Sequence, residues 1–376
     1  MQIDQVSSDV IRVALYLDSK MPGFVSELWV DEDLTKTLRA SVPSDNEIKK
    51  VISNTYDEIN NLPKSRRSTY LTAILNSLAY QIINFGKIIS YAEFTKNAFG
   101  FEIVRVTEEE IKNIVRKLSD LENITGLNRQ ETCLKYSLLP SEYQKTFEEY
   151  VTKAKGILPS IILNFPDKGF EFEVITGKPW SAFNSHTAPF RSRLTLNSDV
   201  SFTKLDLWRL AFHEAYGGHH SELSNKDLLL TNEGRGEHGL VITFSPQTFV
   251  SEAIAESIFV FLSGLDHGDN DALVGWCYDR LTFALHNLST YMFFDDHLTR
   301  EQIDTKLQAY PISDKTRENI LNFSTDPLFG KYAPVYYTAY NFLENLYTKT
   351  SKKDELIKTL FTEPCTVELL TKEFNT

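Results

Sequence analysis

The chain has 376 residues, a formal net charge of −12 and a hydrophobic content of 42%, which is that of an ordinary soluble globular protein. The acidic balance argues against nucleic-acid binding, because phosphate contacts need clustered Lys and Arg. Three widely spaced cysteines indicate neither a disulfide framework nor a cysteine-type zinc site. Without a signal-peptide pattern or an apolar run long enough to span a membrane, we expect a cytoplasmic protein with no membrane partner.

The first part of the chain is predicted to be helical. Apolar residues recur there at helical spacing, and Pro or Gly follows several of the segments. Residues 68–85 are apolar on several sides and are expected to be buried. The acidic first turn after Thr107 favours a helix, because negative charge there complements the helix dipole. The predicted helices cover residues 10–17, 34–40, 48–59, 68–85, 89–99, a segment opening at 107, and 142–155.

Strands and helices mix after residue 157. Residues 170–175 (FEFEVI) and 191–197 (RSRLTLN) alternate as half-buried strands do, and 240–244 is a short apolar strand. Helices resume at Pro246, with Ser245 as a cap and Pro at the first position. The further predicted helices cover residues 281–294, 300–309, 313–322 and 336–348.

The predicted fold class is therefore mostly α (α+β), with a small β-sheet beside a central helix. We divide the chain into a helical N-terminal region, residues 1–156, and a second region, residues 157–376, which carries the sheet, the candidate site and the C-terminal helices. The two regions could also form one continuous domain.

The segment 205–222, LDLWRLAFHEAYGGHHSE, contains three histidines and two glutamates that could bind a metal or transfer protons. His213 and Glu214 end an apolar helical run. In the zinc motif H-E-x-x-H, two histidines four residues apart share one helix face, and the glutamate stays free to deprotonate a water. Here a glycine stands four residues after the first histidine, and the next histidines are His219 and His220.

This spacing needs an interruption of the helix. In a straight helix His219 would point roughly 240° away from His213, and His220 would lie about 10 Å further along the axis. Gly217 and Gly218 supply a place for a bulge or break, since glycine is poor in helix interiors and tolerates unusual dihedrals. The alternative is a surface helix that ends at a glycine cap and binds no metal.

The helix predicted from Pro246 supplies the second half of the site. It is largely apolar, and its only charged residues are Glu252 and Glu256, four apart on one face. Carboxylates in such a helix are costly to bury unless a cation or hydrogen bonds meet them. Glu252 is the candidate third ligand of a His₂Glu zinc site, and Glu256 could orient a ligand histidine. The alternative is a solvent-facing edge that includes Ser251 and Ser257.

HEAYGGHH followed by SEAIAES resembles the glutamate-zincin (gluzincin-like) zinc metallopeptidases. More closely, it is similar to a largely uncharacterised bacterial group with H-E-x-x-P-G-H-H and a later E-G-x-A-x-x-x-E. The flanking MPGFVSELW, KPWSAFN and SRLTLN also resemble that group, although only the two metal motifs are specific. Gly217 stands where the group has proline, and Ala253 where it has glycine. A glycine can adopt the dihedrals that a proline would impose, with less rigidity.

The resemblance implies a zinc-dependent hydrolase, a metallopeptidase or protease that cleaves peptide or small amide substrates with one Zn²⁺ ion. It places His213, His219 and Glu252 as ligands and Glu214 as the general base. His220 is the alternative second histidine; His219 is preferred because it directly follows a small residue. Zinc would polarise the scissile carbonyl and lower the pKa of its water.

Other residues are assigned to the substrate and to the oxyanion, which needs a donor besides the metal. In zincins a tyrosine or histidine from a later helix often fills this role, and we assign it to Tyr337 and Tyr340. Tyr336 and Arg193 are candidate substrate contacts, the latter for a carboxylate. The alternatives are aromatic core packing and a surface arginine. His186 is predicted to lie in a loop.

Two other functions stay open at this point. One is a zincin-fold protein repurposed for a non-peptide metabolite, and the other is a helical binding protein without catalysis. Convergence of His213, Glu252 and one of the two later histidines separates the metal-site hypotheses from the last one.

Overall fold

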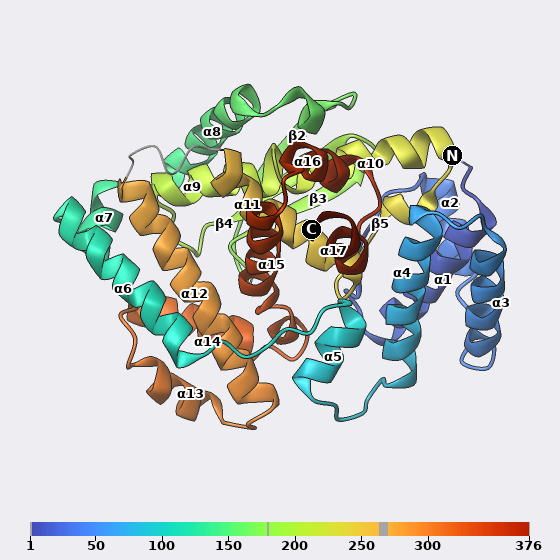
Figure 1. Cartoon of the computed structure of the whole chain (residues 1–376), viewed down its shortest axis with the longest axis horizontal. Coiled ribbons are helices and arrows are strands. Elements are labelled where there is room, and N and C mark those ends of the chain that lie inside the picture. The colour runs from blue at the N-terminus through green and yellow to red at the C-terminus, as the bar shows by residue number, and fades with distance from the viewer. Residues whose placement is uncertain (1, 179, 263–269, 376) are drawn as a thin grey trace.

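The computed structural model describes residues 2–178, 180–262 and 270–375. The described chain is mostly helical with two small sheets, which confirms the predicted fold class. In the view of Figure 1, α1 to α4 (residues 5–83) lie on one side, and α6 (Glu108–Thr125) and α12 to α14 (residues 270–324) lie on the other. Between them run α11 (Pro246–Leu262) and α15 (Val335–Lys349).

Local capping explains where the N-terminal helices begin. The Asp4 side chain accepts from Ser7 N at the start of the first helix, and Thr107 and Glu110 form a reciprocal capping box. The elements of this part are α1 (Gln5–Lys20), β1 (Val25–Leu28), α2 (Glu32–Ala40), α3 (Ile48–Asn61), α4 (Arg66–Ile83), α5 (Tyr91–Ala98), α6 (Glu108–Thr125), α7 (Arg129–Lys135) and α8 (Tyr143–Ile157).

A three-stranded sheet has the order β2 (Phe170–Ile175), β4 (Arg191–Asn197) and β3 (Ala182–Ala188). The pair β2–β4 is parallel and β3–β4 antiparallel, with His186 opposite Ser192. The prediction that His186 lies in a loop is therefore wrong. The small and polar residues of β3 carry little strand signal of their own, and the pairing with β4 supplies the order.

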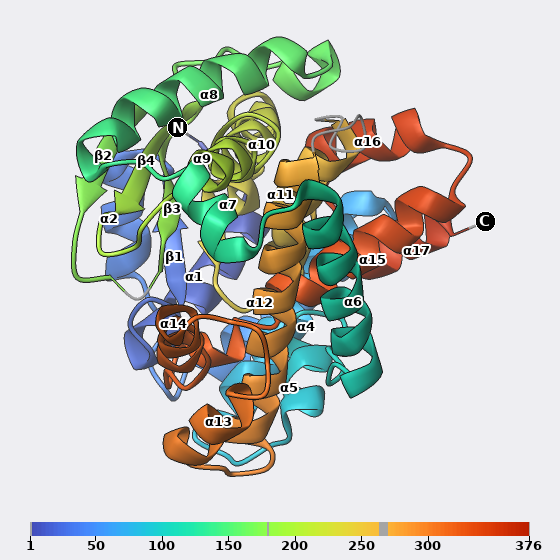
Figure 2. The ribbon, with the colours of Figure 1, turned by 90° about the vertical axis from the view of Figure 1, so that its left-hand side faces the viewer.

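The elements around the candidate site follow this sheet. They are α9 (Lys204–Leu210), the π-helical turn η3 (Ala211–Ala215), α10 (His219–Glu233), β5 (Leu240–Ile242), which pairs with β1, and α11 (Pro246–Leu262). Figure 2 shows α8 lying over α9 and the sheet. The C-terminal helices are α12 (Asn270–Phe294), α13 (Arg300–Leu307), α14 (Asp314–Ser324), α15 (Val335–Lys349), α16 (Lys353–Thr362) and α17 (Val367–Phe374).

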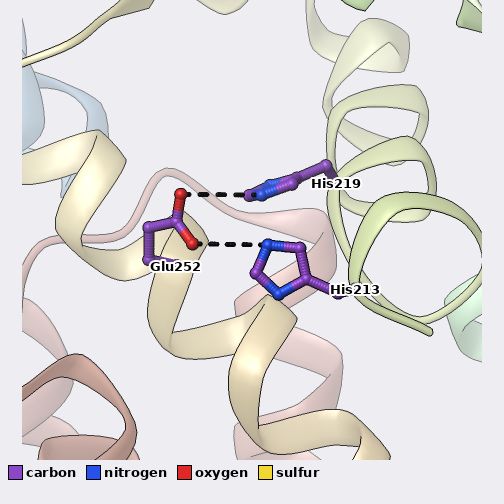
Figure 3. Close-up of side chains that lie close together, drawn as sticks. All are labelled: His213, His219 and Glu252. Carbon is purple, nitrogen blue, oxygen red and sulfur yellow. Dashed lines mark ion pairs between the residues drawn. The ribbon is translucent and has the colours of Figure 1, made fainter. Parts of the chain in front are cut away.

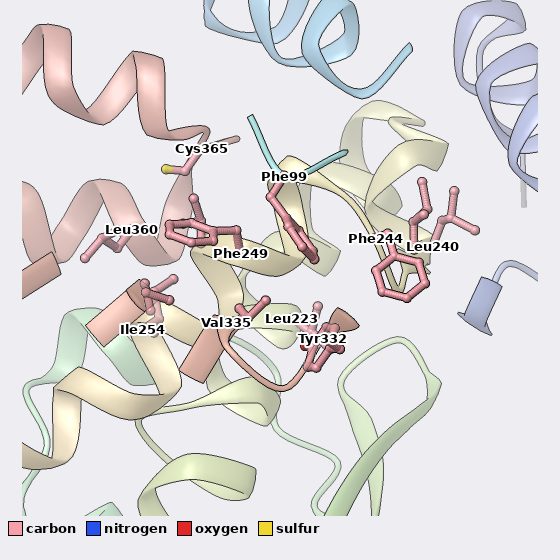
Figure 4. Close-up of a cluster of buried hydrophobic side chains, with 14 of the residues drawn as sticks. Phe99, Leu223, Leu240, Phe244, Phe249, Ile254, Tyr332, Val335, Leu360 and Cys365 are labelled. Atoms are coloured by element: carbon pink, nitrogen blue, oxygen red, sulfur yellow. The ribbon is translucent and has the colours of Figure 1, made fainter. Parts of the chain in front are cut away.

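The main hydrophobic cluster packs α11 against α15 and against the end of α5. Phe99, Phe244 and Phe249 are buried within it, next to Val335 (Figure 4). Residues of both predicted regions contribute to this cluster. Burial of this apolar surface holds α11 in place, at about 25 cal/mol per Å².

Across residues 2–178, 180–262 and 270–375, no helix combines the length and the apolar character that crossing a membrane would require.

Candidate metal centre

The helix that carries His213 is interrupted, as the spacing predicted. It widens into the π-helical turn η3, and Tyr216 then adopts an extended conformation (φ −81°, ψ 117°). Gly217 follows with φ +106°, Gly218 has φ −120° and ψ −135°, and a new helix begins at His219. The two histidines therefore lie on separate helical segments, which removes the geometric obstacle of a straight helix.

The two glycines have different roles. Gly217 has a φ that proline cannot adopt, because the proline ring holds φ near −65°. Gly217 therefore does not use the freedom to adopt a proline-like conformation. Gly218 is required by space, since a Cβ there would lie 1.9 Å from the carbonyl oxygen of His213.

His213, His219 and Glu252 converge in the interior (Figure 3). Nε2 of His213 lies 3.6 Å from Oε2 of Glu252, and Nε2 of His219 lies 3.7 Å from Oε1 of Glu252. All three ligand atoms lie within 4.8 Å of one another. Zinc bonds of about 2.0–2.2 Å in a tetrahedral site place ligand atoms roughly 3.5 Å apart. The two distances to Glu252 are close to that value.

Burial makes this arrangement costly without a cation. Glu252 is 5% exposed and Glu256 2% exposed, so the solvent-facing alternative for these glutamates is wrong. Oε2 of Glu252 is buried without a hydrogen-bond partner among the described residues. An orphaned buried carboxylate oxygen beside two imidazoles is what a divalent cation would satisfy.

The electrostatics agree with this interpretation. Burial raises the pKa of Glu252 to about 7, although His213 opposes the shift. Burial lowers the pKa of His213, but the carboxylates of Glu214 and Glu256 more than offset it and raise the pKa to about 9. Three carboxylates, those of Glu214, Glu252 and Glu256, thus lie within 4.0 Å of the His213 ring, an arrangement in which a cation could replace the proton of that ring.

Neighbouring side chains contact the candidate ligands. Oε1 of Glu256 lies 3.0 Å from Nδ1 of His213, in the orienting position that the sequence predicted. The hydroxyl of Tyr332 donates to Oε1 of Glu252 at 2.6 Å. The sequence analysis did not identify Tyr332, which lies just before α15. The tyrosine-rich segment 331–340 (KYAPVYYTAY), to which Tyr332 belongs, could have pointed to it.

The predicted general base lies beside the ligand group. Oε1 of Glu214 is 4.0 Å from Nε2 of His213. The backbone oxygen of Glu214 accepts a hydrogen bond from the side chain of Asn184 on β3 at 2.5 Å, which ties the turn η3 to the sheet. Burial raises the pKa of Glu214, with His213 opposing the shift.

The tyrosines of α15 need a correction. The ring of Tyr336 lies 6.3 Å from that of His213 and lines the cleft. Tyr337 and Tyr340, assigned as catalytic, instead flank Arg280, whose guanidinium lies 4.4 and 4.2 Å from their ring centres. Successive helix residues point about 100° apart, so Tyr337 faces another side of α15 than Tyr336 does. Tyr340 lies about 6 Å further along the axis, and its hydroxyl donates to Glu344.

Arg193 lies on the outer sheet surface. Its side chain is 47% exposed and forms an ion pair with Glu171 at 3.1 Å. This placement matches the surface-arginine alternative and does not support the predicted contact with a substrate carboxylate.

The cleft beside the ligand group has a volume of about 1220 Å³, and His213, Glu214 and Tyr336 lie in its wall.

His220, the alternative ligand, points into a separate polar network. Its Nδ1 lies 2.8 Å from Oγ of Ser192, and its Nε2 lies 3.3 Å from Oδ1 of Asp167. Asp167 also contacts Lys155 and the hydroxyl of Tyr216. Among the described residues, the group that could hold a metal is His213, His219 and Glu252 alone, so the geometry favours His219.

Asp167→Asn should destabilise the fold in a pH-dependent way. Burial raises the pKa of Asp167, but hydrogen bonds from His220, Lys155 and Tyr216 outweigh it and hold the pKa well below its usual range. Because the native pKa is below the unfolded value of about 3.9, the ionised group stabilises the fold above that pH, and the contribution is lost as pH falls through the native pKa. Urea unfolding should show a larger loss at pH 7 than at pH 3. Asp120→Asn, at an exposed position, is the control, and an equal loss at both pH values would contradict the assignment.

Comparison with known proteins gives a fold but no family. No family profile matches the chain, and no curated protein matches it. A protein from Colwellia psychrerythraea, named as a candidate lipoprotein, is 12% identical with a TM-score of 0.54, over 91% of this chain and 65% of its own. A candidate lipoprotein of unknown function from Shewanella oneidensis is 15% identical with a TM-score of 0.44, over 98% of this chain and 73% of its own. This chain thus spans 65% of the length of the first structure, and that likeness concerns the fold alone.

Proposed function

We propose that the chain is a zinc-dependent hydrolase, a metallopeptidase that cleaves peptide or other amide bonds. The observation that carries the proposal is the convergence of His213, His219 and Glu252 around an orphaned carboxylate oxygen. Such a reaction also needs a general base, and the carboxylate of Glu214 lies 4.0 Å from Nε2 of His213. The resemblance of HEAYGGHH and SEAIAES to glutamate-zincin motifs supports the same function.

The residues of the chain have separate roles in this proposal. His213, His219 and Glu252 would hold one zinc ion, which supplies Lewis acidity and lowers the pKa of a water molecule when bound. Glu214 accepts the proton of the attacking water and passes it to the leaving amine. Tyr336, in the wall of the cleft, is the candidate contact for the substrate.

The remaining assignments are predictions of the same proposal. The partner is a peptide or small amide substrate, and neither nucleic acid nor a membrane is expected. The compartment is predicted to be cytoplasmic. A zincin-fold protein repurposed for a non-peptide metabolite would bind the same metal and would leave peptides uncut, so substrate screening separates it from a peptidase.

The first test is the metal content of the purified protein by elemental analysis. We expect close to one zinc per chain in the parent and its loss in His213→Ala and His219→Ala, because each variant removes a ligand. His220→Gln is the matched control and should keep the metal, since His220 bonds Ser192 and Asp167. A parent that binds no metal even after zinc is added would exclude the hydrolase function.

A further inference from the structure

A buried polar chain leads away from His219 on the side opposite Glu252. Nδ1 of His219 lies 3.1 Å from Oγ of Ser251, the residue before Glu252 on α11. The hydroxyl of Ser251 donates to Oε2 of Glu222, whose Oε1 pairs with Nζ of Lys226. Ser251, Glu222 and Lys226 are all buried.

The spacing on α10 explains why these groups meet. His219, Glu222 and Lys226 are three and four residues apart, so they share one helix face. This face packs against α11, which supplies Ser251. A buried Lys–Glu pair such as Lys226–Glu222 adds little to the free energy of unfolding, because desolvation offsets the attraction. Stability alone therefore does not explain why this pair is buried here, and we consider a role in positioning its neighbours.

Counting protons along the chain fixes the direction of each hydrogen bond. The carboxylate of Glu222, paired with Lys226, only accepts, so the single hydroxyl proton of Ser251 points to Glu222. The oxygen of Ser251 can then only accept from His219, which places a proton on Nδ1. Nε2 of His219 therefore carries the free lone pair, and it is this atom that faces Glu252.

We propose that Ser251, Glu222 and Lys226 form a positioning chain that holds His219 in the Nδ1-protonated tautomer and thereby sets the affinity of the metal site. The inference rests on the proposed zinc site. It adds to that proposal how each histidine is held. His213 faces the carboxylate of Glu256 directly, whereas His219 is linked to the carboxylate of Glu222 through the hydroxyl of Ser251.

Zinc affinity, measured by competition with a chelator, tests the chain. Ser251→Ala should weaken zinc binding about 10- to 100-fold, as loss of such outer partners does. Ser257→Ala is the matched control: Ser257 lies on the same helix, is 0% exposed, and its hydroxyl has no hydrogen-bond partner among the described residues. Ser251→Thr keeps the hydroxyl and should restore most of the affinity. Equal zinc affinity in Ser251→Ala and Ser257→Ala would overturn the proposal.

Glu222→Gln tests the proton order itself. Lys226 would donate to the amide oxygen, leaving the amide NH₂ to donate to Ser251. The hydroxyl of Ser251 would then donate to His219, moving the ring proton to Nε2 and weakening zinc binding although the shape is kept.

The ¹⁵N signals of the histidine ring in metal-free protein report this tautomer directly. We expect Nδ1–H in the parent and a shift towards Nε2–H in Glu222→Gln; an Nε2–H parent would overturn the inference whether or not the parent binds zinc. A parent that binds zinc with the expected tautomer and cleaves no peptide would instead reject the proposed peptidase and leave the positioning chain standing.

Discussion

Glu214→Gln should abolish most peptide hydrolysis while the protein keeps its metal. The carboxylate lies 4.0 Å from Nε2 of His213, and an amide of the same shape cannot accept the proton of the attacking water. General-base catalysis contributes about 10²- to 10⁴-fold, so kcat should fall by that factor. Zinc content should stay at the parental level, because the group that could hold the metal consists of His213, His219 and Glu252.

Glu27→Gln is the matched control for Glu214→Gln, because it makes the same substitution at a second buried glutamate that is close enough to Glu214 to feel its charge. Its carboxylate accepts from the backbone N of His186 at 2.6 Å, which a glutamine oxygen can also do. Burial raises the pKa of Glu27 to about 8, so the acid is largely neutral at pH 7 and glutamine resembles it. We expect near-parental activity in this variant. If Glu214→Gln kept more than a tenth of the parental kcat, Glu214 would not be the base; if it lost zinc, its role would be that of a ligand.

Local signals predicted much of the fold. The strands at 170–175 and 191–197 and the start of α11 at Pro246 agree with the structure, because alternation and a Ser-Pro start are readable within a few residues. The elements β1, β3, α7, α10, α16 and α17 were not predicted. The strand β1 pairs with β5, more than 200 residues away, and such long-range pairing has no local signature.

The candidate ligand group was indicated by a glycine pair between two histidines and by two isolated glutamates in an apolar helix. The preference for His219 over His220 came from the resemblance to related motifs. The outer partners of these ligands were not indicated. Tyr332 reaches Glu252, whereas Tyr337 and Tyr340 pack on Arg280, and this choice depends on how α15 is rotated and shifted against α11. Such rigid-body placement is set by side-chain packing over the whole interface.

One backbone turn, between His213 and His219, both positions the candidate ligands and connects them to the sheet. The turn between His213 and His219 lets two helical segments present their imidazoles to Glu252, and the backbone oxygen of Glu214 within it is tied to Asn184 of the sheet. A change of this turn should therefore affect stability and metal affinity together, whereas a change of a ligand side chain affects metal affinity first.

Gly218→Ala should cause such a joint loss. A Cβ at this position would lie 1.9 Å from the carbonyl oxygen of His213 and 2.5 Å from that of Phe212. These are backbone atoms, which cannot rotate away, so the turn itself must open. Forced overpacking typically costs about 1–3 kcal/mol, and we expect the upper part of this range or more. Urea unfolding and chelator competition on the same variant would measure the two effects.

Gly156→Ala is the control that separates the turn from a general effect of the substitution. Gly156 lies within α8, and a Cβ there would meet no heavy atom within 4 Å. Alanine is favoured over glycine inside a helix by about 1 kcal/mol, so this variant should be as stable as the parent or more stable, with unchanged zinc affinity. Loss of stability in Gly218→Ala with full zinc affinity would mean that the ligands are held independently of the turn. Loss of both, with Gly156→Ala unaffected, would identify the turn as the element that brings the two histidines together.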